Sequence, residues 1–486
     1  MTTAALYGRP LALLTDLYQL TMAYGYWSAG MAQREAVFHL FFRRHPFGGE
    51  FSVACGLAAA VDFIERFRFE KDDLEYLAGL RGSDGRPLFE PAFLDHLAGL
   101  RLSCDLDAIP EGTVVFPHEP LVRVRGALLE CQLLETPLLN QINFSTLIAT
   151  KAARVCLAAT GDEVIEFGLR RAQGIDGGMS ATRAAYVGGC QSTSNLMAGR
   201  LFDIPVRGTL AHSWVMAFDD ELEAFDVYAQ ALPANSVFLV DTYDTLQGVR
   251  HAVEAGRRLR QRGHEMLGIR LDSGDLAELS QAARRILDEQ GFRAAKIVAS
   301  GDLDEYEITK LKERGARIDM WGVGTRLATG HDQGALGGVY KLAAIRDAGG
   351  QWQYRAKRSD DPAKATLPGI HQVRRFAATD ATLAGDVIYS EPEGIDESAQ
   401  AVNPADGSTM SFEAGTPHED LLVPVFRGGR RVYDLPTLQA SRQRTLEQLG
   451  RLPVEVKRLE PPRVYPVGLE RRLSEMRSRL TGPRLD

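Results

Sequence analysis

The spacing of hydrophobic residues over the first 160 positions predicts a succession of short helices and strands. Apolar side chains recur at helical intervals over residues 10–30, further short helical runs fall between 57 and 99, and a long apolar helix is expected over about 128–158. Strands are expected at about 36–42, 103–107, 113–116 and 121–125. This order predicts a small α+β domain over residues 1–150 that ends in a helical linker.

From residue 164 the chain changes to a regular alternation of apolar strands and amphipathic helices. Helices are expected over 245–263 and 276–290, where apolar residues form a stripe on one face. The strands are expected at about 164–168, 206–210, 236–241, 266–271, 296–300 and 319–323. Repeated βα units imply a parallel sheet, either closed into a barrel or open, so we expect an α/β domain over residues 151–345.

The pattern loosens over residues 346–486. Gly-, Pro- and Asp-rich segments follow a basic run from Lys357 to Arg375, and one helix is expected near 435–450. These residues give no indication of chemistry.

Composition and charge narrow the class of protein. The 486 residues are 45% hydrophobic and 25% charged, as in ordinary globular proteins of two or three domains. A formal net charge of −8 argues against partners such as nucleic acid or a membrane surface. Because the chain shows neither a secretory signal nor a membrane-spanning run, we expect a cytoplasmic protein. Its five cysteines are scattered without a C-x-x-C pair, so neither a disulfide framework nor a zinc site is indicated.

Polar motifs follow three consecutive predicted strands. They are Ile269–Asp275, with Arg270 and Asp272; Ala299–Leu303, with Ser300, Gly301 and Asp302; and Trp321–Arg326, with Gly322, Gly324 and Thr325. In a parallel barrel the carboxyl ends of the strands build the active site. Two carboxylates there could hold a ribose, an arginine could clamp an anion, and a glycine turn could bind phosphate. An ion-pair network, helix caps and a tight turn would explain each motif singly.

Two further strand ends carry candidate groups. His212 follows the expected strand 206–210 and is either structural or a nucleophile and proton carrier. Phe167 offers a ring for stacking, or a core residue, and Arg170 or the adjacent Arg171 supplies a charged clamp. A phosphorylated sugar together with a small, flat, anionic base fits this set of side chains.

These motifs resemble those of the nicotinate phosphoribosyltransferases, over most of residues 10–345. The matching segments are Thr15–Thr21, Phe41–Arg43, Glu166–Gly174, His212–Ser213, Arg270–Asp275, Ser300–Asp302 and Gly322–Thr325. The resemblance implies an irregular parallel α/β barrel and a smaller α+β domain formed by N-terminal and C-terminal segments. It also implies a homodimer with a shared active site, and residues 346–486 would complete the smaller domain and the dimer.

The resemblance further implies a reaction. Nicotinate and 5-phosphoribosyl 1-diphosphate would give nicotinate mononucleotide and diphosphate in the salvage branch of NAD biosynthesis. ATP would be hydrolysed to ADP and phosphate through a phosphohistidine, at the position of His212. Mg²⁺ is implied by the diphosphate and ATP, with protein ligands that the sequence does not assign.

Individual residues take roles from the same resemblance. Catalysis would rest on His212, Asp272 and Asp302. Nicotinate would contact Phe167, Arg170, Thr209 and Arg270, together with Tyr18 of the partner subunit. The ribose and phosphates would be bound by Asp272, Ser300, Gly301, Asp302, Gly322, Gly324 and Thr325.

Ser194 bears on the choice of base. It matches a position where the related nicotinamide enzymes carry an aspartate, and a carboxylate there would repel nicotinate whereas a hydroxyl can donate to it. Ser194 could instead cap the following helix. The alternatives are a nicotinamide or quinolinate phosphoribosyltransferase, a catalytically dead relative that binds metabolites, and an unrelated barrel enzyme. A dead relative would be expected to lose one of the polar groups named above, and a Schiff-base aldolase would need a lysine at a strand end, which none of the six has.

Overall fold

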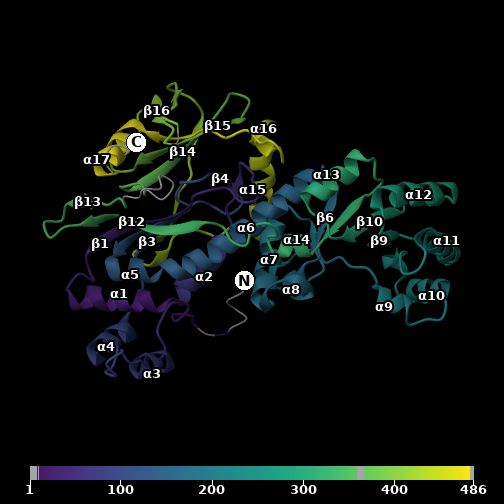
Figure 1. The fold of residues 1–486 in the computed structure, drawn as a ribbon, viewed down its shortest axis with the longest axis horizontal. Helices are drawn as coiled ribbons and strands as arrows, with labels where there is room; N and C mark the ends of the chain where they lie inside the picture. The colour runs from purple at the N-terminus through teal and green to yellow at the C-terminus, as the bar shows by residue number, and fades with distance from the viewer. Residues whose placement is uncertain (1–7, 9, 358–365, 405, 482–486) are drawn as a thin grey trace. The chain divides into compact units, whose positions relative to one another are not determined.

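The computed structural model describes residues 8, 10–357, 366–404 and 406–481 (Figure 1). The chain forms two compact units, of which the first joins Met1–Thr150 to Ala335–Asp486 and the second is Lys151–Gly334. The predicted fold class is confirmed, since one unit contains a parallel sheet with helices and the other is built from both ends of the chain.

A seven-stranded antiparallel sheet brings the two ends of the chain together in the first unit. Its order is β13-β12-β1-β5-β3-β19-β20. The strands are β1 (Glu35–Phe42), β3 (Asp105–Ala108), β5 (Val122–Ala127), β12 (Gly338–Arg346), β13 (Trp352–Tyr354), β19 (Val423–Arg427) and β20 (Arg430–Arg431). Every residue of β1 after Glu35 is buried, which explains why its sequence is apolar except for His39. Because β12 pairs with β1, the second unit ends at Gly334 and not at the expected residue 345.

The helices of the first unit follow the expected order up to α15, and α16 and α17 were not expected. The helices are α1 (Leu17–Ser28), α2 (Leu57–Arg66), α3 (Lys71–Gly79), α4 (Pro91–Gly99), α5 (Leu128–Leu133), α15 (Leu438–Arg451), α16 (Val454–Lys457) and α17 (Arg471–Thr481). The long helix predicted over 128–158 is divided at Leu134 into α5 and α6 (Glu135–Ala159). Two short strands, β2 (Ser52–Val53) and β4 (Val114–Val115), pair separately.

A second sheet of the first unit was not foreseen from the sequence. Its order is β17-β16-β21-β15-β14-β18. The strands are β14 (His371–Ala377), β15 (Leu383–Ser390), β16 (Ala399–Val402), β17 (Thr409–Phe412), β18 (His418–Asp420) and β21 (Val467–Glu470). The end of the basic run, Arg374 and Arg375, lies on β14, whereas its residues 358–365 are outside the described part of the chain.

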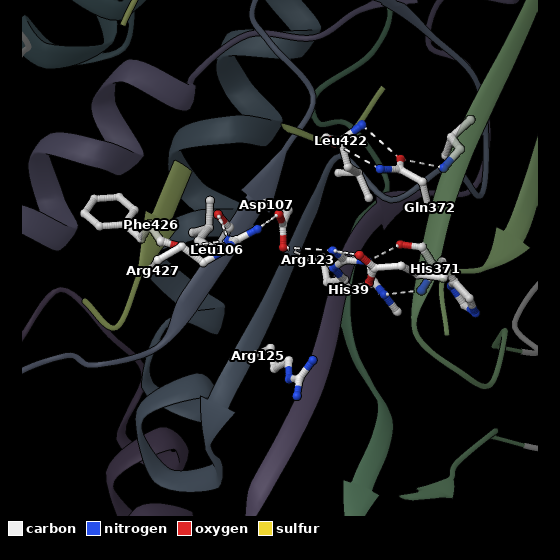
Figure 2. A network of polar contacts seen from close by, with 12 residues as sticks. His39, Leu106, Asp107, Arg123, Arg125, His371, Gln372, Leu422, Phe426 and Arg427 are labelled. Atoms are coloured by element: carbon white, nitrogen blue, oxygen red, sulfur yellow. Dashed lines mark hydrogen bonds and ion pairs between the residues drawn. The ribbon is translucent and has the colours of Figure 1, made fainter. Parts of the chain in front are cut away.

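Buried ion pairs join strands of the first unit. Asp107 on β3 accepts hydrogen bonds from Arg123 Nη2 on β5 at 2.9 Å and from Arg427 Nη2 on β19 at 2.6 Å (Figure 2). Arg123 Nη1 also donates to the carbonyl of His371 on β14, at 3.0 Å, which links the two sheets. The His371 ring stacks on that of His39, with centroids 4.3 Å apart. Burial lowers the pKa of His371 to about 4, against a raising effect of its hydrogen bond with the Pro368 carbonyl.

The second unit is built on six parallel strands in the order β7-β6-β11-β10-β9-β8. They are β6 (Glu163–Glu166), β7 (Ser192–Thr193), β8 (Val237–Leu239), β9 (Gly268–Leu271), β10 (Lys296–Gly301) and β11 (Met320–Val323). The sheet has two edges, β7 and β8, so it is a half-barrel.

Helices between these strands cover the sheet. They are α7 (Gly174–Val187), α8 (Leu196–Phe202), α9 (His212–Val215), α10 (Glu221–Ala231), α11 (Thr245–Gln261), α12 (Leu276–Glu289), α13 (Glu305–Glu313) and α14 (Thr325–Ala328), with one-turn helices at Leu169–Arg171 and Pro233–Asn235. Asp275 caps α12 by accepting from the N–H groups of Ala277 and Glu278, and α12 packs on β9 and β10 (Figure 1). No helix in the described residues is long and apolar enough to span a bilayer.

The prediction of a strand at 206–210 is wrong. Val206 forms only an isolated bridge to Thr193, and the second strand of this sheet is the two-residue β7. Such a short polar strand shows no alternation, and Pro205, which precedes Val206, has no N–H to donate to a longer ladder.

Candidate active site

The carboxyl ends of the six parallel strands bring most of the candidate residues to one edge of the second unit. Phe167 follows β6, Ser194 follows β7 and Asp272 follows β9. Ser300 and Gly301 end β10, and Gly324 and Thr325 follow β11 directly. The sheet therefore places on one rim residues that are up to 158 positions apart in the sequence, as its parallel direction requires.

Arg270 is the centre of this rim. Its Nε donates to Ser300 Oγ at 2.7 Å, Nη1 to Thr209 Oγ1 at 3.1 Å and Nη2 to Asp272 Oδ1 at 2.7 Å. A guanidinium carries five N–H groups, so two remain beyond these three contacts. The side chain is held rigidly and can still offer donors to an anionic ligand.

Asp272 lies between Arg270 and His212. Burial raises the pKa of its carboxyl, but the hydrogen bond from Ser300 and the positive charge of Arg270 outweigh burial and bring the pKa below its ordinary value. Its Oδ2 lies 3.7 Å from His212 Nε2. Asp272 is therefore a carboxylate at neutral pH, placed to stabilise positive charge.

Phe167 stands beside the guanidinium, with Arg270 Cζ 5.6 Å from its ring centroid. The ring occupies the space above Gly322, where a Cβ would come within 2.6 Å of Phe167 Cδ2 and Cε2. Gly322 lies inside β11, so in this structure it provides room for the aromatic ring. An aromatic ligand stacked on Phe167 would bring a ring substituent close to Arg270.

Glu166 supports the turn that carries Phe167. This buried carboxylate accepts from Thr193 Oγ1 at 2.6 Å, from Thr182 Oγ1 at 2.8 Å and from the N–H of Gly168. A buried carboxylate with three donors is well satisfied, so it holds the turn in one conformation.

The turn after β10 requires glycine. Gly301 has a φ of +119°, and a Cβ there would lie 3.0 Å from the Asp272 carbonyl oxygen. Asp302 is exposed, and its negative charge raises the pKa of Arg326, after the larger effects of Asp304. Asp304 is buried, pairs with Arg326 and caps α13. Of these two carboxylates, Asp302 is the one open to a ligand.

Three candidate residues lie outside the cluster around Arg270. Arg170 is exposed on the one-turn helix Leu169–Arg171, and Ser194 is exposed while its backbone N–H bonds the Glu166 carbonyl. The cap of α8 is Asn195, whose side chain accepts from Ala198 N, so Ser194 does not serve as the cap. Tyr18 is on α1 of the first unit, with 48% of its surface exposed.

Two residues of the rim were missed. Asp241 follows β8 and accepts from the Asp272 N–H at 2.9 Å and from Ser273 Oγ at 2.6 Å. Thr242 Oγ1 lies 3.2 Å from His212 Nδ1. The sequence contained a signal for Asp241, because this residue follows a run of apolar residues just as Asp272 does.

No group of three or more His, Cys, Asp or Glu side chains in the described residues is arranged to hold a metal ion.

Comparisons with known proteins show the family of this chain. The model of the nicotinate phosphoribosyltransferase (NAPRTase) family matches residues 163–376, and the models of its N-terminal and C-terminal domains match residues 13–143 and 370–477. The nicotinate phosphoribosyltransferase of Bacillus subtilis (strain 168) is 43% identical over 483 residues, which cover 97% of this chain and 96% of the relative. The human protein of that name is 36% identical over 527 residues, with 96% and 95% covered.

Solved structures show the same relationship. The crystal structure of human nicotinic acid phosphoribosyltransferase superposes with a TM-score of 0.82 at 34% identity, covering 96% of this chain and 99% of that one. Nicotinate-nucleotide pyrophosphorylase from Pyrococcus furiosus shares the fold, with a TM-score of 0.67 at 21% identity over 90% of this chain and 95% of that one. This chain belongs to the nicotinate phosphoribosyltransferase family.

Proposed function

We propose that this protein transfers the phosphoribosyl group of 5-phosphoribosyl 1-diphosphate to nicotinate, giving nicotinate mononucleotide and diphosphate for NAD salvage in the cytoplasm. The observation that carries the proposal is the Arg270 cluster, which joins a rigid guanidinium, the ionised Asp272 and the Phe167 ring at one rim. A flat anionic base needs a ring to stack on and a fixed cation for its carboxylate, and both are present.

In this reaction the pyridine nitrogen bonds to the anomeric carbon as the bond from that carbon to diphosphate breaks. Asp272 and Asp302 supply negative charge as the ribose gains positive charge. Ser300 and Gly301, with Gly324 and Thr325, are the proposed contacts of the ribose and its phosphate. Mg²⁺, when bound, neutralises charge on the departing diphosphate. Positioning and electrostatics account for the chemistry without a covalent intermediate on the sugar.

We further propose that ATP hydrolysis is coupled to the transfer through phosphorylation of His212, with ADP and phosphate as products. His212 is half-exposed at the rim and lies next to Asp272. Its exposure would allow the imidazole to reach the terminal phosphoryl group of ATP. Phosphorylation there adds negative charge beside the sugar site and would reorganise it for tighter substrate binding.

The first test measures nicotinate mononucleotide formation with and without ATP in the presence of Mg²⁺. The native chain, His212→Ala and the control His264→Ala, an exposed histidine in the loop after α11, are compared. Product that rises with ATP in the native chain and the control, but not in His212→Ala, is expected. ADP released in step with product by His212→Ala would refute the phosphohistidine. Activity with nicotinamide or quinolinate in place of nicotinate would overturn the assignment of the base and of Ser194.

A shared active site in a homodimer is the remaining part of the proposal. The outer face of α1 exposes Leu17, Tyr18 and Met22, an apolar group suited to a second copy of the chain. Tyr18→Ala and His212→Ala chains, each with reduced activity, should recover activity when they are co-expressed, because each hybrid dimer then contains one complete site. Hybrid dimers with no more activity than the separate variants would exclude a contribution of Tyr18 across the interface.

A further inference from the structure

We propose that Thr242 is a positioning residue for His212, because its hydroxyl holds Nδ1 of the imidazole and keeps Nε2 turned toward Asp272. The two contacts lie at opposite ends of the ring, at 3.2 Å from Thr242 Oγ1 to Nδ1 and 3.7 Å from Asp272 Oδ2 to Nε2. The inference rests on the proposed role of His212 as the phosphorylated residue.

His212 needs such a contact because its own backbone does little to fix it. It is the first residue of the four-residue helix α9, and 40% of its side chain is exposed. An imidazole in that setting can occupy several rotamers, and catalysis requires one of them. The contacts at the two ring nitrogens therefore help to select the rotamer.

Thr242 is itself firmly placed. The residue before it, Asp241, accepts hydrogen bonds from the Asp272 N–H and the Ser273 hydroxyl, at 2.9 and 2.6 Å. The segment that holds one end of the imidazole is therefore fastened to the turn that carries the carboxylate at the other end. Threonine is also restricted at χ1 by its branched Cβ, so its hydroxyl has few alternative directions.

A hydroxyl suits this position chemically. It donates and accepts, so Thr242 can contact Nδ1 in either tautomer of His212 and keep the contact as the ring changes its protonation. A second carboxylate in its place would favour the positively charged imidazolium, which has no free electron pair to attack a phosphoryl group.

The experiment compares Thr242→Val, which keeps the shape and removes the hydroxyl, with Thr242→Ser, which keeps the hydroxyl. Thr309→Val in α13 is the control, since its hydroxyl bonds only the Glu305 carbonyl in its own helix. We measure ATP-dependent kcat, the KM for nicotinate, and the ring-nitrogen NMR signals of His212 in ¹⁵N-histidine-labelled protein, assigned by their loss in His212→Ala.

We expect Thr242→Val to lower the ATP-dependent kcat by about tenfold to a hundredfold, as loss of an orienting partner of a functional histidine does. The KM for nicotinate in the presence of ATP should rise toward the value without ATP and the Nδ1 signal should move, while Thr242→Ser and Thr309→Val stay near native in all three measurements. A native kcat and Nδ1 signal in Thr242→Val would overturn the proposal. So would a loss in Thr242→Ser equal to that in Thr242→Val, because packing of the methyl group would then be responsible. If the native protein shows no ATP dependence, the proposed phosphohistidine fails, and the NMR signals of His212 still decide the role of Thr242.

Discussion

Replacing Gly322 by alanine tests whether the Phe167 ring is positioned by the absence of a side chain beneath it. The added Cβ would stand 2.6 Å from Phe167 Cδ2 and Cε2, against an ordinary contact of 3.4 Å or more. The ring must therefore move by about 0.8 Å, because Gly322 lies inside the paired strand β11 and cannot yield as easily.

The size of the effect follows from this displacement. Phe167 is partly exposed, so the ring can tilt outward, and the cost to the free energy of unfolding should stay near 1 kcal/mol, the low end for overpacking. A shift of nearly 1 Å in a substrate-positioning group can reduce activity by about 100-fold. We therefore expect a fall in kcat/KM for nicotinate of roughly 10-fold to 100-fold, with a small change in stability.

The assay combines steady-state kinetics with urea unfolding. Gly177→Ala in α7 is the matched control, because its Cβ would meet nothing closer than 4.0 Å, and it should leave kcat/KM at the native value. Gly322→Ala combined with Phe167→Leu measures the coupling between the two positions, and the smaller side chain should remove most of the added penalty. Native kcat/KM in Gly322→Ala, or effects of the two substitutions that simply add, would refute the proposed contact.

Two predictions concern the stability of the first unit. Asp107→Asn should lower the free energy of unfolding by about 2 kcal/mol, because Arg123 and Arg427 lose a buried charge partner while Arg123 keeps its ion pair with Glu391. Asp420→Asn, at an exposed pair, should cost about 1 kcal/mol or less, and equal losses in urea unfolding would contradict this. The pKa of His371 is lowered to about 4, so the unfolded chain binds the proton first as the pH falls, and this histidine lowers the free energy of unfolding by about 3 kcal/mol between pH 6.5 and pH 4. The pKa values of His39, His45 and His118 are also lowered by burial, and these groups add to the decline. His371→Gln should flatten that decline by roughly 1.4 kcal/mol per pH unit, and an unchanged slope would show that this histidine is not the group responsible.

The rim of the second unit could be predicted because polar residues at the ends of apolar strands are visible in the local sequence. Arg270 lies near the end of a buried strand and Asp272 and Ser300 follow or end such strands, and parallel strands bring these ends to one edge without any further information. The supporting residues could be found only in part. Asp241 follows the same rule and was overlooked, while the contact between Thr242 and His212 depends on how two loops meet, which no local pattern encodes.

The C-terminal sheet was missed for a different reason. Its strands pair with partners that are distant in sequence, for example β15 with β21, and several are only three or four residues long. Short strands with mixed burial, such as β17 and β18, carry no alternation that distinguishes them from loops. Their stability comes from the tertiary packing of the first unit, and the sequence of each strand alone does not show it.

The sequence left open whether the charged groups at the rim form a structural ion-pair network or a binding site, and the exposure of these groups to solvent favours the second interpretation. A structural network in the same unit exists in Lys151, Arg154 and Glu305, whose side chains are at most 1% exposed and pair within 2.9 Å. Arg270 and Asp272 are 15% and 26% exposed at the edge of the sheet. Ion pairs open to water contribute little to stability, yet here three neighbours fix the guanidinium. Fixing a charged group that solvent can reach adds little to folding, and it is what the recognition of a small anion requires.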